Sequence, residues 1–295
     1  MSSDSSVFPA DSAFALPPAD LRWSGLTHPG KVRPNNEDAF LALSFNGADV
    51  RFLGKVGSAS LTESDYVFAV SDGMGGAKSG EFASRITVDK IIGLLPKSFR
   101  QRAHGGAPDF QDVLPELYLA IHRDLTTLAR SYQECVGMGA TLTLAWFSPG
   151  WLYYAHIGDS RLYYLAAEGP LKQLSQDDSQ VGWLRRQGKL TEREARTHPR
   201  KNILNKALGA GHQFVEPQIG AVSCQAGDRF LLVTDGVTDG LWDHHLEEIL
   251  RQPDAVITPA QQLINEALER SGRDNSTAVV VEMEQAHQAP TFVKP

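Results

Sequence analysis

Cysteine is scarce in this 295-residue chain, which has two, Cys135 and Cys224, far apart in the sequence. Disulfide-bonded extracellular folds usually carry several cysteines, so this pair predicts two free thiols in a reducing cytoplasm. Residues 1–20 also lack a basic region followed by a long apolar core, and we therefore expect no signal peptide.

Basic charge is the second shortage. The chain has 28 Lys and Arg against 35 Asp and Glu, a formal net charge of −7, and no basic arm. Because nucleic acids attract strongly basic surfaces, this balance argues against a nucleic-acid partner.

One stretch lacks charged residues altogether. Residues 139–158 contain no Asp, Glu, Lys or Arg, which by charge alone would be typical of a membrane span. However, Ser148, Pro149 and Gly150 divide the stretch into two short segments with polar residues at intervals. Two strands joined by a turn fit this pattern better, so we expect no membrane span.

What the chain does contain is a mixture of strand-like and helix-like segments. Strands are predicted at 21–28, 39–43, from 66 onward, and at 140–146, 151–157, 161–167, 171–174, 215–222, 229–234 and 276–284. Helices are predicted at 78–95, 112–132, 179–188, 191–197 and 258–271. Hairpin-spaced strands with a few long helices predict an α+β fold in which helices cover antiparallel sheets.

These segments are expected to form one domain over residues 21–285. Residues 1–20 are rich in Ser, Asp, Ala and Pro and are predicted to be a flexible tail, as is 286–295. Two segments interrupt the pattern of the domain: a Gly/Ser-rich insertion or hairpin loop at 46–64 and a basic, Gly-containing connector at 96–108.

Seven acidic residues lie in short, glycine-punctuated motifs. They are Glu37, Asp38, Asp72, Asp159, Asp235, Asp239 and Asp274. Most follow an apolar run that predicts a buried strand, so the acid lies where the strand ends. Carboxylates gathered at one edge of a sheet would repel each other unless divalent cations neutralised them, and Mg²⁺ and Mn²⁺ prefer oxygen ligands. The pattern predicts an acid-lined hydrolase site that binds several metal ions, although each acid alone could equally be a turn or cap residue.

The order of these motifs resembles the metal-dependent protein serine/threonine phosphatases of the PPM or PP2C family, in its bacterial branch. The motifs are Arg33-Pro-Asn-Asn-Glu-Asp, Asp72-Gly-Met-Gly-Gly, Gly137-Met-Gly-Ala-Thr, Gly158-Asp-Ser-Arg, Asp235-Gly-Val-Thr-Asp and Arg273-Asp-Asn. They extend over residues 23–284. The resemblance implies a four-layer α-β-β-α sandwich with two packed antiparallel β-sheets flanked by helices.

The resemblance also implies two core Mn²⁺ or Mg²⁺ ions and their ligands. Asp72 would bridge the ions and Gly73 would offer its backbone carbonyl. Glu37 would bind one ion, and Asp235 with Asp274 the other. A hydroxide shared by the two ions would attack phosphorus directly, with no phospho-enzyme.

Other residues would support that centre. Asp159 and Asp239 resemble the acids of a third, weaker metal site, and Asp38 would orient a ligand or a metal-bound water. Arg33 resembles the arginine that binds the phosphate through paired hydrogen bonds. Asn275 is expected to support its neighbour by hydrogen bonding.

One residue departs from part of the family, because Met74 stands where some relatives have a histidine that could act as general acid. The histidines nearest the motifs are His156, which fits a core histidine, and His198, which fits either a turn or a contact with substrate. Residues 175–208 resemble the family's flap beside the cleft. Their basic side chains either steer phosphorylated peptides or form an ordinary solvated surface.

The function that follows is hydrolysis of phosphoserine and phosphothreonine in proteins. The substrates would be those of a cognate Ser/Thr kinase, and we expect a monomer. A catalytically inactive binding or scaffold module is the alternative, but it would usually have lost a metal-binding acid, and here every acid is present. Small phosphoesters or phosphotyrosine also stay possible substrates, because metals and arginine recognise only the phosphate.

Overall fold

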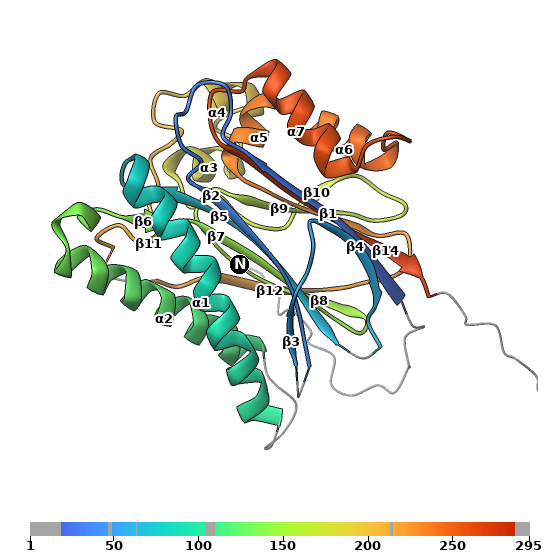
Figure 1. Ribbon diagram of the computed structural model, residues 1–295. Helices are drawn as coiled ribbons and strands as arrows, with labels where there is room; N and C mark the ends of the chain where they lie inside the picture. Colours follow the sequence, from blue (N-terminus) through green and yellow to red (C-terminus); the bar gives the residue numbers. More distant parts are fainter. Residues whose placement is uncertain (1–18, 47–48, 63, 104–109, 213–214, 287–295) are drawn as a thin grey trace, which may run out of the picture.

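The computed structural model describes residues 19–46, 49–62, 64–103, 110–212 and 215–286 (Figure 1). Two antiparallel sheets pack face to face, and helices cover the outer face of each. The expected α+β fold with a four-layer α-β-β-α sandwich is therefore confirmed. Tails were predicted at 1–20 and 286–295. Most of their residues, 1–18 and 287–295, lie outside the described residues, whereas Ala19 and Asp20 belong to the first strand.

The first sheet has six strands. Their order is β10 (Lys172–Gln173), β9 (Arg161–Leu165), β13 (Arg229–Val233), β14 (Ser276–Gln285), β1 (Ala19–His28) and β4 (Val56–Ser60). The helices over its outer face are α5 (Asp235–Gly240), α6 (Asp243–Arg251) and α7 (Pro259–Arg270).

The second sheet has eight strands. Its main path is β11 (Leu208–Gly209), β6 (Gly139–Ala140), β5 (Asp65–Met74), β7 (Leu142–Ser148), β8 (Trp151–Ile157) and β12 (Gln218–Ser223). Beside this path, β2 (Asp38–Phe45) pairs with β5, and β3 (Val50–Phe52) pairs with β2. Its outer face is covered by α1 (Ala77–Ala103) and α2 (Phe110–Ser131).

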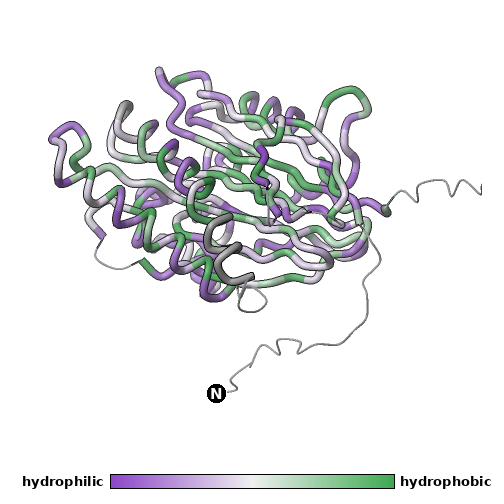
Figure 2. Tube along the Cα trace, turned by 60° about the horizontal axis from the view of Figure 1, so that its bottom comes forward, coloured by the Kyte–Doolittle hydropathy of each residue, from purple (hydrophilic) through white to green (hydrophobic). Residues whose placement is uncertain are grey.

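The alternation of side chains along the strands builds the layers. On β5, Phe68 and Val70 face the other sheet, whereas Val67 and Ala69 face α1 and α2. Successive residues of a strand point to opposite faces, so one strand serves two cores. Figure 2 shows apolar residues along the central strands and a mixture of polar and apolar residues along the outer helices.

Two helices begin with capping residues. At α4 (Glu192–Thr197), the Thr191 hydroxyl accepts from the Glu194 amide, and the Glu194 carboxylate accepts from the Thr191 amide. At α7, Thr258 caps the helix and Pro259 occupies its first turn. Both arrangements satisfy amide groups that a helix start leaves unpaired.

Three predictions of local structure need correction. The connector predicted from Pro96 is helical as far as Ala103, because residues 97–103 are mostly strong helix formers; 104–108 lie outside the described residues. The insertion at 46–64 contains strands β3 and β4, except for 47, 48 and 63, which are not described. Helices α5 and α6 were not predicted, although α6 buries Leu246, Ile249 and Leu250 at helical spacing.

The uncharged stretch at 139–158 forms strands, as expected. Strands β7 and β8 pair across the turn at Ser148–Trp151. Of the helices in the described ranges, none combines the length and apolar character that a membrane crossing requires.

Candidate metal and phosphate site

The acidic motifs meet at one edge of the sandwich because their strands end there. Asp38 begins β2 directly opposite Asp72 near the end of β5. Asp235 follows β13, Asp274 precedes β14, and Asp159 follows β8. These ends surround a cavity of about 340 Å³. Its lining includes Arg33, Glu37, Asp72, Gly73, Met74, Asp159, Asn202, Leu204, Asp235 and Asp274.

Two glycines allow the chain to approach the acids closely. A Cβ atom on Gly73 would lie 1.9 Å from the Gly80 carbonyl oxygen, and one on Gly80 would lie 2.4 Å from Glu37 Oε2. Neither position can hold a larger residue without moving backbone or the Glu37 carboxylate. The glycines therefore fix the first turns of α1 against the loop that carries Glu37.

Asn275 fastens that loop to the neighbouring strand. Its Nδ2 donates to the carbonyls of Pro29 at 2.9 Å and Asn35 at 2.8 Å, and its Oδ1 accepts from the Glu37 amide at 2.8 Å. Its own amide donates to Asp274 Oδ1 at 2.9 Å. Asn275 thus supports both Asp274, as expected, and the distant Glu37.

The acids perturb one another strongly. Burial, followed by the charge of Asp38 and Asp235, raises the pKa of Asp72 well above its usual range. Burial, followed by the charge of Asp159 and Asp239, raises the pKa of Asp235 in the same way. Burial and the charge of Asp177 raise the pKa of Asp159 to about 7. Such a cluster favours cations, because each ionised carboxylate destabilises the next.

Asp38 lies behind the cavity lining and is held by two hydroxyl groups. Thr234 and Thr277 each donate to its Oδ2 at 2.7 Å, while its buried Oδ1 has no hydrogen-bond partner. Burial raises the pKa of Asp38 to about 7 in spite of these donors. A water or cation beside Asp38 and Asp72, which face each other across β2 and β5, would satisfy this unpartnered buried oxygen.

Two basic side chains neutralise opposite ends of the cluster. Arg33 Nη2 lies 2.7 Å from Asp274 Oδ2, and this hydrogen bond raises the pKa of Arg33. Lys201 Nζ lies 2.6 Å and 2.5 Å from the two carboxylate oxygens of Asp239. Asp239 lines a second, smaller cavity of about 60 Å³, which shares Asp159, Asp235 and Asn202 with the first.

The acids that line the cavity have the oxygen ligands that divalent ions need, but their side chains are not arranged as a complete set of metal ligands. Over the described ranges, no three His, Cys, Asp or Glu side chains converge in a metal-binding arrangement. Arg33 and Lys201 account for part of this, since they engage oxygens of Asp274 and Asp239. Glu37, Asp72, Asp159 and Asp235 have no such basic partner on the cavity side and present oxygens, the ligands that Mg²⁺ and Mn²⁺ prefer.

The sequence profile of the Protein phosphatase 2C family matches residues 55–271, which is most of the domain. The chain belongs to the protein phosphatase 2C family. This membership confirms the resemblance on which the roles of the acids were predicted.

Curated relatives within the family are bacterial. The chain is 34% identical over 266 residues to the serine/threonine protein phosphatase PstP of Mycobacterium tuberculosis, covering 89% of this chain but 45% of that protein. It thus spans about half the length of that relative. It is 32% identical over 257 residues to the serine/threonine phosphatase Stp of Listeria monocytogenes, covering 87% of this chain and 93% of that protein.

A solved phosphatase 2C structure supplies a metal-containing comparison. The catalytic domain of PstP in complex with two manganese ions has a TM-score of 0.71 and 31% identity, covering 90% of this chain and 99% of that one. The protein phosphatase 2C fold in that structure therefore accommodates two manganese ions.

The structure brings most of the predicted site residues together. Glu37, Asp72, Gly73, Asp159, Asp235 and Asp274 line one cavity with Arg33. Asp239 lies beside it in the smaller cavity, and Asp38 lies behind the lining. Their individual metal-binding roles stay predictions.

The two histidines have structural surroundings. His156 is fully buried, with Thr143 Oγ1 2.8 Å from its Nδ1 and the Gly158 carbonyl 3.0 Å from its Nε2. His198 ends α4, and its Nδ1 accepts from the Arg200 amide. Neither lines the larger cavity, which agrees with the core and turn interpretations.

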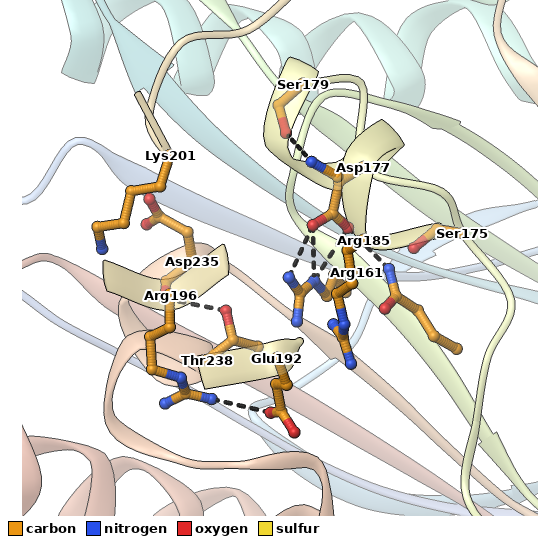
Figure 3. Close-up of polar contacts among 12 residues, drawn as sticks. Arg161, Ser175, Asp177, Ser179, Arg185, Glu192, Arg196, Lys201, Asp235 and Thr238 are labelled. Carbon is orange, nitrogen blue, oxygen red and sulfur yellow. Dashed lines mark hydrogen bonds and ion pairs between the residues drawn. The ribbon is translucent and has the colours of Figure 1, made fainter. Parts of the chain in front are cut away.

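Sequence reasoning missed the ion pair that anchors the flap, defined here as residues 175–208. Arg161 donates to both carboxylate oxygens of Asp177 at 2.7–3.1 Å (Figure 3) and to the Tyr163 hydroxyl at 3.0 Å. Arg161 is the last residue of the Gly158-Asp-Ser-Arg motif, so its place in a motif was the available signal. Nothing in the sequence indicated Asp177 as its partner.

Proposed function

We propose that this chain is a Mn²⁺- or Mg²⁺-dependent phosphoprotein phosphatase that hydrolyses phosphoserine and phosphothreonine by direct attack of water. The observation that carries the proposal is the desolvated acid cluster around Asp72, which lines an open cavity together with Arg33. Family membership and the named relatives support the same activity.

In this proposal the acids divide two ions between them. Asp72 would contribute to holding both ions, and the Gly73 carbonyl would offer a further oxygen. Glu37 would hold one ion, and Asp235 with Asp274 would hold the other. Divalent ions in such a site lower the pKa of water and stabilise the charge that develops on the phosphoryl group. Asp159 and Asp239 would belong to a weaker third position.

The side chains around the ions orient and charge-balance the substrate. Arg33 would leave Asp274, bind two phosphate oxygens and stabilise the transition state. Its side chain is half exposed, so it can move without disturbing the core. Asp38, held through Oδ2 by Thr234 and Thr277, would accept a hydrogen bond from water at its free Oδ1.

In this proposal a water molecule donates the proton to the leaving alkoxide. Met74 lines the cavity and cannot donate a proton, and no histidine is among the described residues that line it. An inactive scaffold would usually lack a metal-binding acid, and here all the acids expected of an active enzyme are present.

The proposed biological setting follows from the same activity. The catalytic domain would comprise residues 19–285, which includes the whole of β1, and would act as a monomer in the cytoplasm. Its substrates would be proteins phosphorylated by a cognate Ser/Thr kinase. Small phosphoesters and phosphotyrosine would fit the same phosphate-binding groups.

The test is hydrolysis of a phosphothreonine peptide by the full chain with Mn²⁺, with Mg²⁺ and with a chelator. Asp235→Asn serves as the matched variant. We expect metal-dependent phosphate release that the variant lacks. Absence of turnover with either metal, in a protein shown to be folded, would contradict the proposal.

A further inference from the structure

Lys201 of the flap makes a two-point contact with Asp239 of α5. Its Nζ lies 2.6 Å from Oδ1 and 2.5 Å from Oδ2. Both side chains are partly buried, with 31% and 25% of their surfaces exposed. The ammonium group therefore occupies the position from which a cation would engage both oxygens of this carboxylate.

The acid that Lys201 holds is part of a shared electrostatic cluster. The charges of Asp159 and Asp239 both raise the pKa of Asp235. The smaller cavity is lined by these three acids and by Lys201 itself. A single positive charge here interacts with several carboxylates at once, unlike a lone surface ion pair.

A second flap cation holds the same end of α5. Arg196 Nη1 donates to the Asp239 carbonyl at 3.2 Å, and its Nη2 donates to the Leu241 carbonyl at 2.8 Å. Its guanidinium lies 4.2 Å from the centre of the Trp242 ring. The contact made by Lys201 thus extends a docked surface and is not an isolated long side chain.

The contact also sets the position of the catalytic cavity wall. The residue after Lys201, Asn202, lines both cavities, and Leu204 lines the larger one. Where Lys201 holds Asp239, these two flap residues lie against the acid cluster. Displacing Lys201 would remove this ionic contact between α5 and the segment that carries both residues.

We propose that Lys201 is a positioning residue whose ammonium group takes the place of a third cation at Asp239 and holds the flap against the catalytic cavity. The proposal rests on the proposed function, because it concerns the same site. An ammonium group bound to both oxygens of one carboxylate repels a divalent ion at the same group, so the two cations compete for Asp239. A third ion therefore binds only when the flap releases Asp239, and the undisturbed protein binds two.

The test measures bound Mn²⁺ by equilibrium dialysis followed by metal analysis, which does not require turnover. Wild-type protein is expected to bind two ions, and Lys201→Met is expected to gain a third. We expect its affinity for that ion to rise at least about fivefold, at the low end of couplings between linked sites. Lys201→Arg should restore two ions, and Lys201→Met with Asp239→Asn should return to two.

The matched control is Lys206→Met, whose Nζ lies 4.0 Å from Asp178 and touches none of the cluster acids. It should leave the ion count at two. Limited trypsin digestion supplies a second readout: Lys201→Met and Asp239→Asn should both hasten cleavage at the exposed Arg193 and Arg200, whereas Lys206→Met should not.

The same variants should separate binding from chemistry. If Lys201 positions the flap, Lys201→Met should raise KM for a phosphopeptide more than it lowers kcat, and should change hydrolysis of p-nitrophenyl phosphate less.

The outcomes separate the two proposals. If wild-type protein binds no Mn²⁺, the proposed function and this inference both fail. If it binds ions but Lys201→Met changes neither the third-ion affinity nor flap cleavage, or if Lys206→Met changes them equally, this inference alone fails.

Discussion

The two cavities that share Asp159 and Asp235 differ in what neutralises their acids. In the larger cavity, no ion pair in the described ranges involves Glu37 or Asp72. Arg33 pairs with Asp274, and its charge also acts on Glu37. In the smaller cavity, positive charge comes from Arg161 of β9 and from flap residues, among them Lys201. Acids that the chain leaves unneutralised depend on ions from solution, whereas acids that it neutralises can hold a moving segment in place.

The other ionic contacts of the flap also hold this segment in place. Arg161 with Asp177 and Arg185 with Asp243 hold the flap to the first sheet and to α6, away from the larger cavity. Breaking a buried pair of this kind leaves an uncompensated charge, which is strongly destabilising. The larger cavity can therefore change its ions and ligands while its surroundings stay fixed.

The largest expected effect comes from removing an acid of the larger cavity. Asp72→Asn and Asp235→Asn should each lower metal-dependent phosphatase activity by more than about 100-fold, because even residues that only support metal ligands cost 10–100-fold. Without metal, both variants should melt at higher temperature at pH 8, because one repelling charge is gone. Activity assays and thermal melts measure this.

The matched control for that pair is Glu269→Gln, an exposed acid on α7. It should change neither activity nor the melting temperature of the metal-free protein. Near-normal rates in Asp72→Asn or Asp235→Asn would show that these acids do not hold the ions.

Arg33→Ala should have the next largest effect. Loss of a charge-assisted hydrogen bond to phosphate should lower kcat/KM by about 10- to 100-fold. Mn²⁺ affinity should stay the same or rise, because Asp274 loses a competing cation. Kinetics and metal titration test this prediction, and loss of metal binding would show that Arg33 has another role.

The effect of pH should be intermediate in size. Asp38 and Asp159 have pKa values of about 7, above the usual carboxyl value, so folding favours their protonated forms. Their contribution to stability is present below the unfolded pKa and is lost as pH rises through about 7. The metal-free protein should therefore be less stable at pH 8 than at pH 6.

Metal binding should have the opposite pH dependence, because the ions require ionised carboxylates. Mn²⁺ affinity should rise by about tenfold per pH unit for each proton released. Thermal melts with and without Mn²⁺ at pH 6 and 8 measure both trends. A larger metal-induced stabilisation at pH 6 would contradict the charges assigned to the cluster.

The smallest effect is expected for the exposed flap arginines. Arg193 and Arg200 have no ionic partner among the described residues, unlike Arg185, Arg196 and Lys201. Changing both to Ala should alter kcat/KM for an acidic phosphopeptide by less than about fivefold, and the difference should vanish at high salt. A larger, salt-resistant loss would mean that these arginines bind substrate directly.

Much of the fold was predictable because local patterns agree with tertiary packing. The continuous apolar run at 66–70 identified a strand, and the apolar stripe from Leu114 to Leu125 identified α2, which buries that face. Helix α5 escaped prediction because it has a glycine at Gly236 and another at Gly240, which lower helix propensity. Packing against α7 and β14 stabilises α5 in spite of these glycines.

The candidate site was predictable as a set of acids but not as a set of pairs. Motif order indicated Asp72, Asp235 and Asp274 without any geometry. The pairing of Arg33 with Asp274, 241 residues away, and of Lys201 with Asp239 depends on how loops meet after folding. No periodicity or propensity in the sequence reports such contacts.

The most direct test of the account is to locate Mn²⁺ by anomalous diffraction in crystals grown with the ion at pH 8. The account predicts two strong peaks beside Asp72, one near Glu37 and one near Asp235 and Asp274, with Arg33 released. Lys201 should still hold Asp239. A well-ordered crystal with no peak beside Asp72, or with a strong peak at Asp239 alone, would contradict it.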